Sequence, residues 1–412
     1  MLKTYRKGQK ANDFVTQIVK VLTGCYKTKN KTPSLERKMK TRLTSNLVFG
    51  LAAASILATP IFADEAAPAA SGPEVKFSGE VEFDAYTGDL INEDIKSHSY
   101  ASTFDLNVDV KFNDKWSASV QLEADGETTD PVAIYNGAFV QYTHSDKLSV
   151  KFGDLTFSEG AFLNYYGYDD PADNAAGMAE HDIRGFEIDY NGIVFGLGYG
   201  RGGNDNQVCS EVDGENVCVD VAYDLHLAYE LGLGDHVLRP FVDYKSYQEP
   251  EHNELHAGLD ANLKFGTFGL HLVYGLHADK LGEDAPKATH ALLAEPSVEF
   301  GSVSIKATAF YAIIDDDEPT LHGEEIPEYF FVYGEPSFRV SDALALGVPL
   351  EFHTHSTDKD DKLSMFDVGV RAYVTPIDGL EITGFAMVDV PVGDDAGDDT
   401  ALTLGLETVF SF

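Results

Sequence analysis

Apolar and polar residues alternate in short stretches along the chain from Val75 to its last residue. In residues 75–85 every odd position is apolar or Gly, and every even position is charged or Ser. A period of two places successive side chains on opposite faces of a β-strand, so the pattern predicts strands with one apolar face. We expect eighteen strands, over residues 75–85, 104–112, 116–124, 132–144, 148–153, 185–190, 193–200, 221–230, 237–247, 254–265, 268–278, 288–300, 303–313, 329–340, 344–353, 364–374, 380–390 and 400–412.

The connections between these segments alternate between short and long. Tight turns rich in Asn, Asp, Gly and Ser are expected at residues 113–115, 191–192, 266–267, 301–302 and 341–343. Longer acidic connections lie between them, for example at residues 125–131, 279–287, 315–325, 354–363 and 391–399. This alternation predicts an up-and-down antiparallel meander with both termini on the side of the short turns.

The placement of charge separates a membrane barrel from an exported soluble β-sandwich, which would also show alternation. In the eighteen spans, Asp, Glu, Lys and Arg fall only on the polar face. The apolar face is aromatic near the strand ends, as at Tyr274 and Phe300, and aliphatic between them. Aromatic rings favour the two membrane interfaces, whereas a sandwich core has no reason to sort residues by height. We therefore predict an all-β fold, a transmembrane antiparallel up-and-down β-barrel of 18 strands, with 16 strands as the alternative.

The chain is strongly acidic, and its basic residues concentrate at the N-terminus. Its 412 residues contain 30 Lys and Arg against 68 Asp and Glu, which gives a formal net charge of -38. Nucleic-acid binding requires an excess of basic residues, so no nucleic-acid partner is expected. Twelve of the 30 basic residues lie within residues 1–63.

This basic region ends in the pattern of an export signal. Lys40 and Arg42 precede an apolar run over residues 47–57, and residues 60–63 offer a cleavage site. The run is shorter than the roughly 20 residues of a membrane-spanning helix. We expect an N-terminal extension and signal peptide over residues 1–63, a linker over residues 64–73 and the barrel over residues 74–412. Translation from Met39 is the favoured interpretation, and a longer leader that begins at Met1 is the alternative.

The two ends of the expected barrel resemble a known family. Residues 401–412, ALTLGLETVFSF, resemble the closing strand of bacterial outer-membrane proteins, and residues 75–79, VKFSG, are similar to the opening strand of porins. The resemblance to Gram-negative outer-membrane porins, general-diffusion or maltoporin-like, implies a water-filled outer-membrane channel for passive diffusion of small hydrophilic solutes or ions. It also implies surrounding outer-membrane lipid, recognition of Phe412 by the barrel-assembly machinery, and a homotrimer. A structural or adhesive barrel with an occluded lumen is the alternative.

The longest interruption of the pattern covers residues 155–182. Eighteen strands enclose a wide lumen, and selectivity requires something to occupy it. Porins have a long loop after a corresponding strand, folded inward to narrow the pore. The resemblance implies a pore constriction formed by Phe157, Glu159, Tyr165, Tyr166, Tyr168, Asp169, Asp170 and Asp173. A solvated or partner-contacting surface loop is the alternative interpretation.

Five basic residues point into the lumen by their position in the alternation. These pore-wall residues are Arg239, Lys245, Lys306, Arg339 and Arg371. Opposite an acidic loop they would create a transverse field, as in general porins. Alternatively, Arg339 pairs with Glu335 and Arg371 with Asp367, each four residues away. Acidic residues outnumber basic ones on the polar faces, so we expect a preference for cations.

Two Cys remain in the mature chain, and they lie close together in a long connection. Cys209 and Cys218 are separated by eight residues, and export exposes them to oxidising conditions, so we expect a disulfide between them. Neither a His nor a third Cys lies near them, so this pair predicts no metal site.

The sequence contains no motif that points to an enzyme or a cofactor. His-Glu-x-x-His, Gly-x-Ser-x-Gly and phosphate-binding loops do not occur. The inward-facing His226, His256, His271 and His277 could serve a hydrolase together with an acid such as Asp260. Titration within the pore is the role that we expect for them.

Overall fold

The chain divides into two compact units, Met1–Ser71 and Gly72–Phe412. The computed structural model describes residues 72–412, with gaps at 89, 92–96, 126–135, 164–180, 200–206, 213–214, 250–251, 280, 282–286, 314–319, 322–323, 326–327, 357–361 and 394–399. The expected extension and signal peptide, and all but the end of the expected linker, therefore lie outside the described residues.

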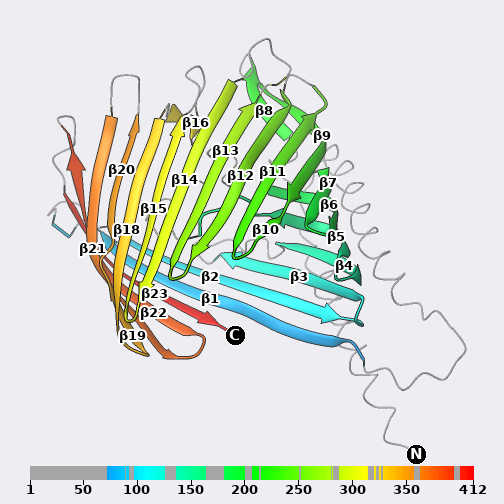
Figure 1. Cartoon of the computed structure of the whole chain (residues 1–412). Helices are drawn as coiled ribbons and strands as arrows, with labels where there is room; N and C mark the ends of the chain where they lie inside the picture. Colours follow the sequence, from blue (N-terminus) through cyan, green and yellow to red (C-terminus); the bar gives the residue numbers. More distant parts are fainter. Residues whose placement is uncertain are drawn as a thin grey trace, which may run out of the picture. The chain divides into compact units, whose positions relative to one another are not determined.

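Eighteen strands form the wall of a closed antiparallel barrel in the described part of the chain (Figure 1). They are β1 (Glu74–Gly88), β2 (Ser97–Lys111), β3 (Trp116–Asp125), β4 (Gly137–Ser145), β5 (Leu148–Phe157), β6 (His181–Tyr190), β7 (Ile193–Tyr199), β9 (Glu215–Tyr229), β11 (His236–Tyr247), β12 (Glu254–Phe265), β13 (Phe268–Asp279), β14 (Lys287–Phe300), β15 (Val303–Ile313), β18 (Glu328–Ser341), β20 (Leu350–Ser356), β21 (Lys362–Ile377), β22 (Leu380–Val392) and β23 (Ala401–Ser411). The short β19 (Leu344–Gly347) belongs to the same strand of the wall as β20, because β18 and β21 both pair with the two of them.

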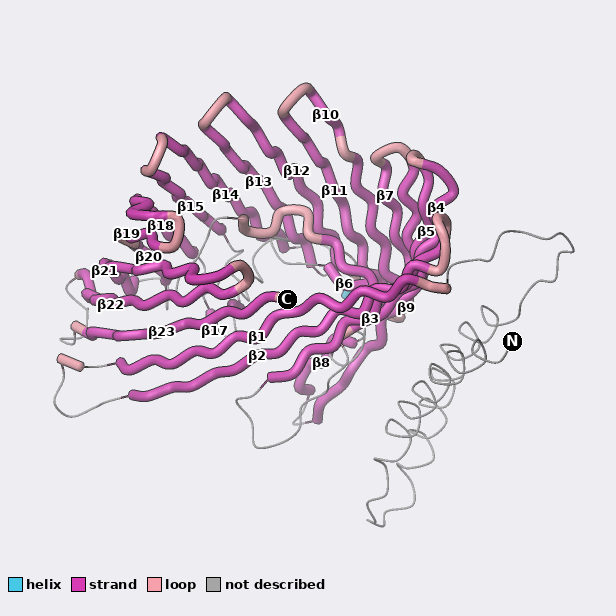
Figure 2. Tube along the Cα trace, turned by 90° about the horizontal axis from the view of Figure 1, so that it is seen from below, coloured by secondary structure: helices cyan, strands magenta, loops and turns pink. Residues whose placement is uncertain are grey.

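Consecutive strands pair along the chain, and the first strand pairs with the last. Residues Glu80–Thr87 of β1 pair with residues Leu404–Ser411 of β23, which closes the sheet on itself. Figure 2 shows the resulting ring, in which β1 lies between β2 and β23. Closure leaves no open sheet edge, so the backbone groups of every strand find partners within the wall. The prediction of 18 strands is confirmed, and the alternative of 16 is wrong.

The strand ends differ from the expected bounds, mostly by extension. β2 begins at Ser97 and β6 at His181, well before the alternation becomes clear. Backbone hydrogen bonds between two strands do not require alternating side chains. A hairpin can therefore continue beyond the part of the strand whose outward face contacts lipid. In the same way β9 reaches Glu215 and pairs with the unexpected β8 (Gln207–Val212). The expected strand over residues 344–353 is interrupted at Val348 and Pro349.

Short turns connect the strands at one rim and long connections at the other. The turn between β6 and β7 has Asn191 at φ 54° and Gly192 at φ 86°. Two positive φ values in succession are those of a type I′ turn, which matches the twist of a hairpin and favours Asn-Gly. The other short segments are β10 (Leu231–Leu233), which pairs with the start of β11, and β16 (Thr320–Leu321) with β17 (Glu324–Glu325) in a long connection.

Exposure in the barrel is the reverse of that in a soluble protein. Large apolar side chains such as Tyr100 (75% exposed), Phe300 (64%) and Val370 (58%) lie on the outward face. Charged side chains such as Glu295 (0%) and Asp224 (0%) are buried inside. Exposed aromatic residues such as Tyr190, Phe300 and Phe410 lie near strand ends, but exposed aliphatic residues such as Val303 and Ile377 lie there too, so the expected sorting by height is only partial. A wall of this kind matches lipid outside and polar surroundings inside. Among the described residues, no helix is long and apolar enough to cross a bilayer.

Candidate functional site

The inner face of the barrel is built from carboxylates and histidines. In the described part of the chain, the buried Asp, Glu and His side chains are Asp154, Glu187, Asp224, His226, Asp243, Asp260, His271, Glu295, Glu335, Glu351 and Asp367. All except Asp154 lie on a wall strand at the position that alternates with outward apolar residues, so the period of two places these groups together. Asp154 follows the exposed Phe152 by two positions on β5 and is buried nonetheless. Buried charges persist in proteins only where they are paired or hydrogen-bonded, and the contacts of these side chains therefore define the interior.

The segment that follows β5 lies inside the barrel and contacts the opposite part of the wall. The backbone N–H of Gly160 donates to Asp260 Oδ2 at 3.2 Å, and that of Leu163 donates to Glu295 Oε2 at 2.9 Å. The ring of Phe162 packs against Phe310 of β15, with centroids 5.5 Å apart. Figure 2 shows a loop segment within the ring of strands beside β12. The described start of this connection is therefore held by the inner wall of β12, β14 and β15.

His271 joins the two carboxylates that hold this segment. Its Nδ1 lies 2.6 Å from Glu295 Oε2, and its Nε2 lies 3.2 Å from Asp260 Oδ1. Thr308 donates to Glu295 Oε1 at 3.2 Å. Glu295 thus receives hydrogen bonds from two wall strands and from the segment after β5, and it is the centre of the network.

A second network lies where the same segment leaves β5. The ring of Phe157 stacks on that of His226, with centroids 3.8 Å apart. His226 Nδ1 lies 2.6 Å from Asp243 Oδ1, and its Nε2 lies 3.6 Å from Glu159 Oε2. His181, at the start of β6, lies 2.9 Å from Asp224 Oδ1 through its Nε2. The two ends of the connection are therefore both anchored to β9 by imidazole groups.

These contacts place part of the expected constriction. Phe157 and Glu159 lie inside the barrel at the foot of the connection. The other expected members, Tyr165, Tyr166, Tyr168, Asp169, Asp170 and Asp173, lie outside the described residues. The wall that contacts the described segment carries Asp260, Glu295 and His271, and Arg239 lies near enough to Glu159 to interact with it electrostatically.

The five expected basic wall residues lie on β11, β15, β18 and β21. Arg371 Nη1 lies 3.3 Å from Glu335 Oε2 and 3.3 Å from the hydroxyl oxygen of Tyr333. Arg239 forms an ion pair with Glu230. In the strand register Lys245 lies between Asp224 and Glu254, and Lys306 lies opposite Glu335. Arg339 is exposed near the short turns.

The Arg371 pair differs from the pairing expected within each strand. Glu335 contacts Arg371 of β21 instead of Arg339 of its own strand. The intervening residue is Gly347, where an added Cβ would lie 1.9 Å from Glu335 Oε1. The missing side chain lets the carboxylate reach across a whole strand, which spacing along one strand does not reveal.

Two ion pairs between β5 and β6 lay outside the sequence prediction. Lys151 Nζ lies 3.0 Å from Glu187 Oε1, and Arg184 Nε lies 2.5 Å from Asp154 Oδ1. Each pair joins residues that face one another in the register of the hairpin. The long connection after Phe157 joins β5 to β6, so no short turn between them fixes that register, and the sequence carried no direct signal for either pair.

The expected disulfide lies in the hairpin of β8 and β9. Cys218 is disulfide-bonded, and Cys209 is its register partner across the hairpin. The backbone register is compatible with the expected pairing of the two Cys, which stays a prediction.

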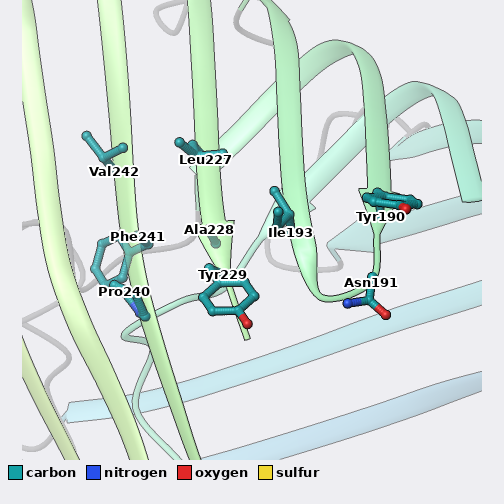
Figure 3. Close-up of a pocket in the computed structure, with 9 residues that line it drawn as sticks. All are labelled: Tyr190, Asn191, Ile193, Leu227, Ala228, Tyr229, Pro240, Phe241 and Val242. Atoms are coloured by element: carbon teal, nitrogen blue, oxygen red, sulfur yellow. The ribbon is translucent and has the colours of Figure 1, made fainter. Parts of the chain in front are cut away.

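An apolar groove lies on the outward face, near the short-turn rim (Figure 3). Its lining includes Tyr190, Ile193, Leu227, Tyr229 and Pro240. The groove follows the break between β9 and β10, where Pro240 of the facing strand has no N–H to donate. Exposed aromatic and aliphatic side chains make it part of the membrane-facing surface, and it contains none of the inner-wall groups.

Comparison with known proteins agrees with this geometry. The family model described as Gram-negative porin matches residues 50–323, more than half of the chain. No curated protein matches the sequence.

Three solved structures illustrate the likeness. A BenF-like porin from Pseudomonas fluorescens Pf-5 aligns with a TM-score of 0.53 at 9% identity, over 82% of this chain and 98% of that one. The outer membrane protein opdK from Pseudomonas aeruginosa aligns with a TM-score of 0.52 at 11% identity, over 82% of this chain and 98% of that one. A loop L8 deletion mutant of OmpT, an outer membrane protein of Vibrio cholerae, aligns with a TM-score of 0.52 at 11% identity, over 83% of this chain and 100% of that one. At these identities the likeness concerns the fold alone. With its closed wall, its lipid-matched exterior and the family match, the chain belongs to the Gram-negative porins and forms an outer-membrane channel for small solutes.

Proposed function

We propose that the barrel is a passive diffusion channel that prefers cations and is narrowed by the connection after β5. The observation that carries the proposal is the docking of Gly160 and Leu163 on wall carboxylates, which supports an inward course for this connection. Phe157 and Glu159, together with Tyr165, Tyr166, Tyr168, Asp169, Asp170 and Asp173, are the proposed lining of the constriction. Filtering is steric and electrostatic, and no covalent step is involved.

The cation preference follows from the sign of the interior charge. One carboxylate acts on a monovalent ion in water with about 0.6 kcal/mol at roughly 7 Å. The Lys and Arg side chains of the wall that have described contacts, such as Arg371, Arg239 and Lys151, are paired with carboxylates. The remaining acidic side chains add to one another in a narrow passage and attract cations until salt screens them.

Planar-bilayer recording should show stepwise currents and a reversal potential of cation sign in a KCl gradient. Glu159→Gln should lower the permeability ratio of K⁺ to Cl⁻ by up to about threefold, because 0.6 kcal/mol corresponds to about that factor. The effect should shrink in about 1 M salt, where the Debye length is about 3 Å. Asp114→Asn, in an exposed turn at the rim, is the matched control and should leave the ratio unchanged. Anion selectivity of the unmodified channel would contradict the proposal.

A structural or adhesive barrel with an occluded lumen is the second candidate. The observation that favours it is the packing of Phe162 against the buried Phe310 and Phe331, which fills part of the interior. The same recording separates the candidates, because an occluded barrel gives no current steps at any voltage. In either case His181, His226 and His271 contact wall carboxylates, and we assign them no catalytic role.

We also propose that the N-terminal region directs export, that Phe412 is read by the barrel-assembly machinery, and that the barrel assembles as a homotrimer. The backbone of Phe412 also closes the barrel, because its N–H donates to Gly79 O at 3.0 Å and its carbonyl accepts from Gly79 N at 3.1 Å.

Phe412→Ala should reduce the amount of folded barrel in the outer membrane of living cells but should not change refolding of the purified chain in detergent. Its backbone bonds survive the change, whereas the aromatic side chain is lost. Phe410→Ala, on the same strand and face, is the control. Equal loss for both variants in cells would contradict a special role of the last residue.

A further inference from the structure

A row of inward-facing titratable residues crosses β9, β11, β12 and β13 near the long-loop rim. Asp243 is the register partner of both His226 and His256, and His256 is the register partner of His277. Glu254 lies two positions before His256 and therefore on the same face of β12. This part of the inner wall brings two imidazoles and a carboxylate together on neighbouring strands.

We propose that Glu254, His256 and His277 bind a divalent transition-metal ion of the Zn²⁺ class. One ligand atom from each of the three residues lies within 4.8 Å of the others. The imidazole rings of His256 and His277 have centroids 4.0 Å apart and are inclined by 48°. Two His and one carboxylate form a common three-ligand set for Zn²⁺, which leaves the fourth position for water or for a group in the lumen.

The carboxylate of Glu254 is held in place by a neighbouring strand. The hydroxyl of Tyr247, a buried residue at the end of β11, donates to Glu254 Oε1 at 2.7 Å. The backbone N–H of Tyr247 donates to Asn253 Oδ1 at 2.9 Å, and Asn253 Nδ2 donates to the hydroxyl oxygen of Tyr244 at 2.9 Å. Bonds of this kind to a metal ligand fix its orientation and raise the affinity. These hydrogen bonds link the end of β11 to the start of β12, where Glu254 and His256 lie.

The charges around the three residues are compatible with a cation. Lys245 lies beside Glu254, but it also lies opposite Asp224, so two carboxylates flank it in the register. Asp243 lies beside His256, and the ring centroid of His181 lies 6.5 Å from that of His256. Thr289 is the register partner of His277 on its other side.

The ligand set indicates which class of cation should bind. Ca²⁺ takes six to eight oxygen ligands and Mg²⁺ prefers oxygen in an octahedron, whereas imidazole suits Zn²⁺, Cu²⁺, Ni²⁺ and Co²⁺. A second group, Glu351, His353 and Asp367 on β20 and β21, has one imidazole and two carboxylates. It serves as the matched comparison, because it lies on another part of the same inner wall.

Titration of the detergent-purified barrel with Co²⁺ tests the proposal directly. The d–d absorption of Co²⁺ reports nitrogen and oxygen ligands in a near-tetrahedral site, and one equivalent should bind. Zn²⁺ should displace it, and Ca²⁺ or Mg²⁺ in large excess should not. Absence of the absorption, or displacement by Ca²⁺ as readily as by Zn²⁺, would overturn the proposal without use of any variant.

Variants then assign the ligands. His256→Gln and His277→Gln should each abolish the Co²⁺ spectrum, and Tyr247→Phe should weaken binding by roughly 10- to 100-fold, the usual effect of losing a bond to a ligand. His353→Gln should leave the spectrum and affinity unchanged. Loss of the signal in His353→Gln with retention in His277→Gln would refute the assignment. The metal readout is independent of current measurements, so it stands apart from the test of the channel.

Discussion

Val370→Arg will lower the free energy of unfolding of the barrel in lipid vesicles by about 2–4 kcal/mol. Val370 is 58% exposed on the outward face of β21, four residues below the aromatic Phe366 on the same face. In a soluble protein an exposed Val would accept Arg at little or no cost. In a bilayer the same position faces hydrocarbon, where a guanidinium loses its water and finds no partner. Denaturant titration of the barrel in vesicles measures the difference.

Two controls isolate the effect of depth. Ile377→Arg introduces the same charge at an exposed position of the same strand, at the short-turn rim, and should cost no more than about 1 kcal/mol. Val370→Leu changes size without charge and should be close to neutral. Equal stability of the two Arg variants would show that the outward face does not contact hydrocarbon, and it would contradict the interpretation of the barrel as a membrane channel.

Glu295→Ala should lower the free energy of unfolding by about 3–5 kcal/mol, the usual cost of removing one partner from a buried ion pair. The side chain is fully buried and accepts from Thr308 and from the N–H of Leu163, and it contacts His271 Nδ1 at 2.6 Å. Its loss leaves three polar groups without this acceptor in a site too enclosed for bulk water. Denaturant titration again measures the loss.

The same variant should change the current as well as the stability. Without Glu295 the segment after β5 keeps the Asp260 contact of Gly160 but loses that of Leu163. We expect noisier open-channel current than in the unmodified protein. Glu295→Gln retains an acceptor and should have a smaller effect on both readings. Glu299→Ala, four residues away on the same face and exposed, should change neither. If Glu295→Ala showed unchanged current noise and an unchanged free energy of unfolding, Glu295 would not anchor the segment after β5.

The alternation of apolar and polar residues was sufficient to predict the barrel wall, because the position and the two faces of each strand follow from its own residues. Alternation in segments such as residues 104–112 decides which side chains face lipid, and the Asn191-Gly192 turn decides where a hairpin reverses. The order of the outward residues Phe268, Leu272 and Tyr274 along β13 could likewise be read from the sequence.

The interior depended on relations between strands that spacing along one strand does not contain. Glu335 reaches Arg371 because the intervening strand has Gly347 at the crossing. Asp154 and Arg184 meet across the β5–β6 pair, one residue outside the predicted bounds of each strand. The inward-facing histidines were identifiable from the sequence, but their partners were not, since His226 contacts Asp243 from the adjacent strand.

The sequence by itself therefore determined an acidic, closed barrel with an apolar exterior. Whether a side chain faces lipid depends only on its own position in the alternation along its strand. Tertiary structure alone decided which carboxylates hold the segment after β5 and which imidazoles lie side by side at the rim. Those contacts depend on strand register and on where a long connection folds, and both are fixed by the closed sheet as a whole.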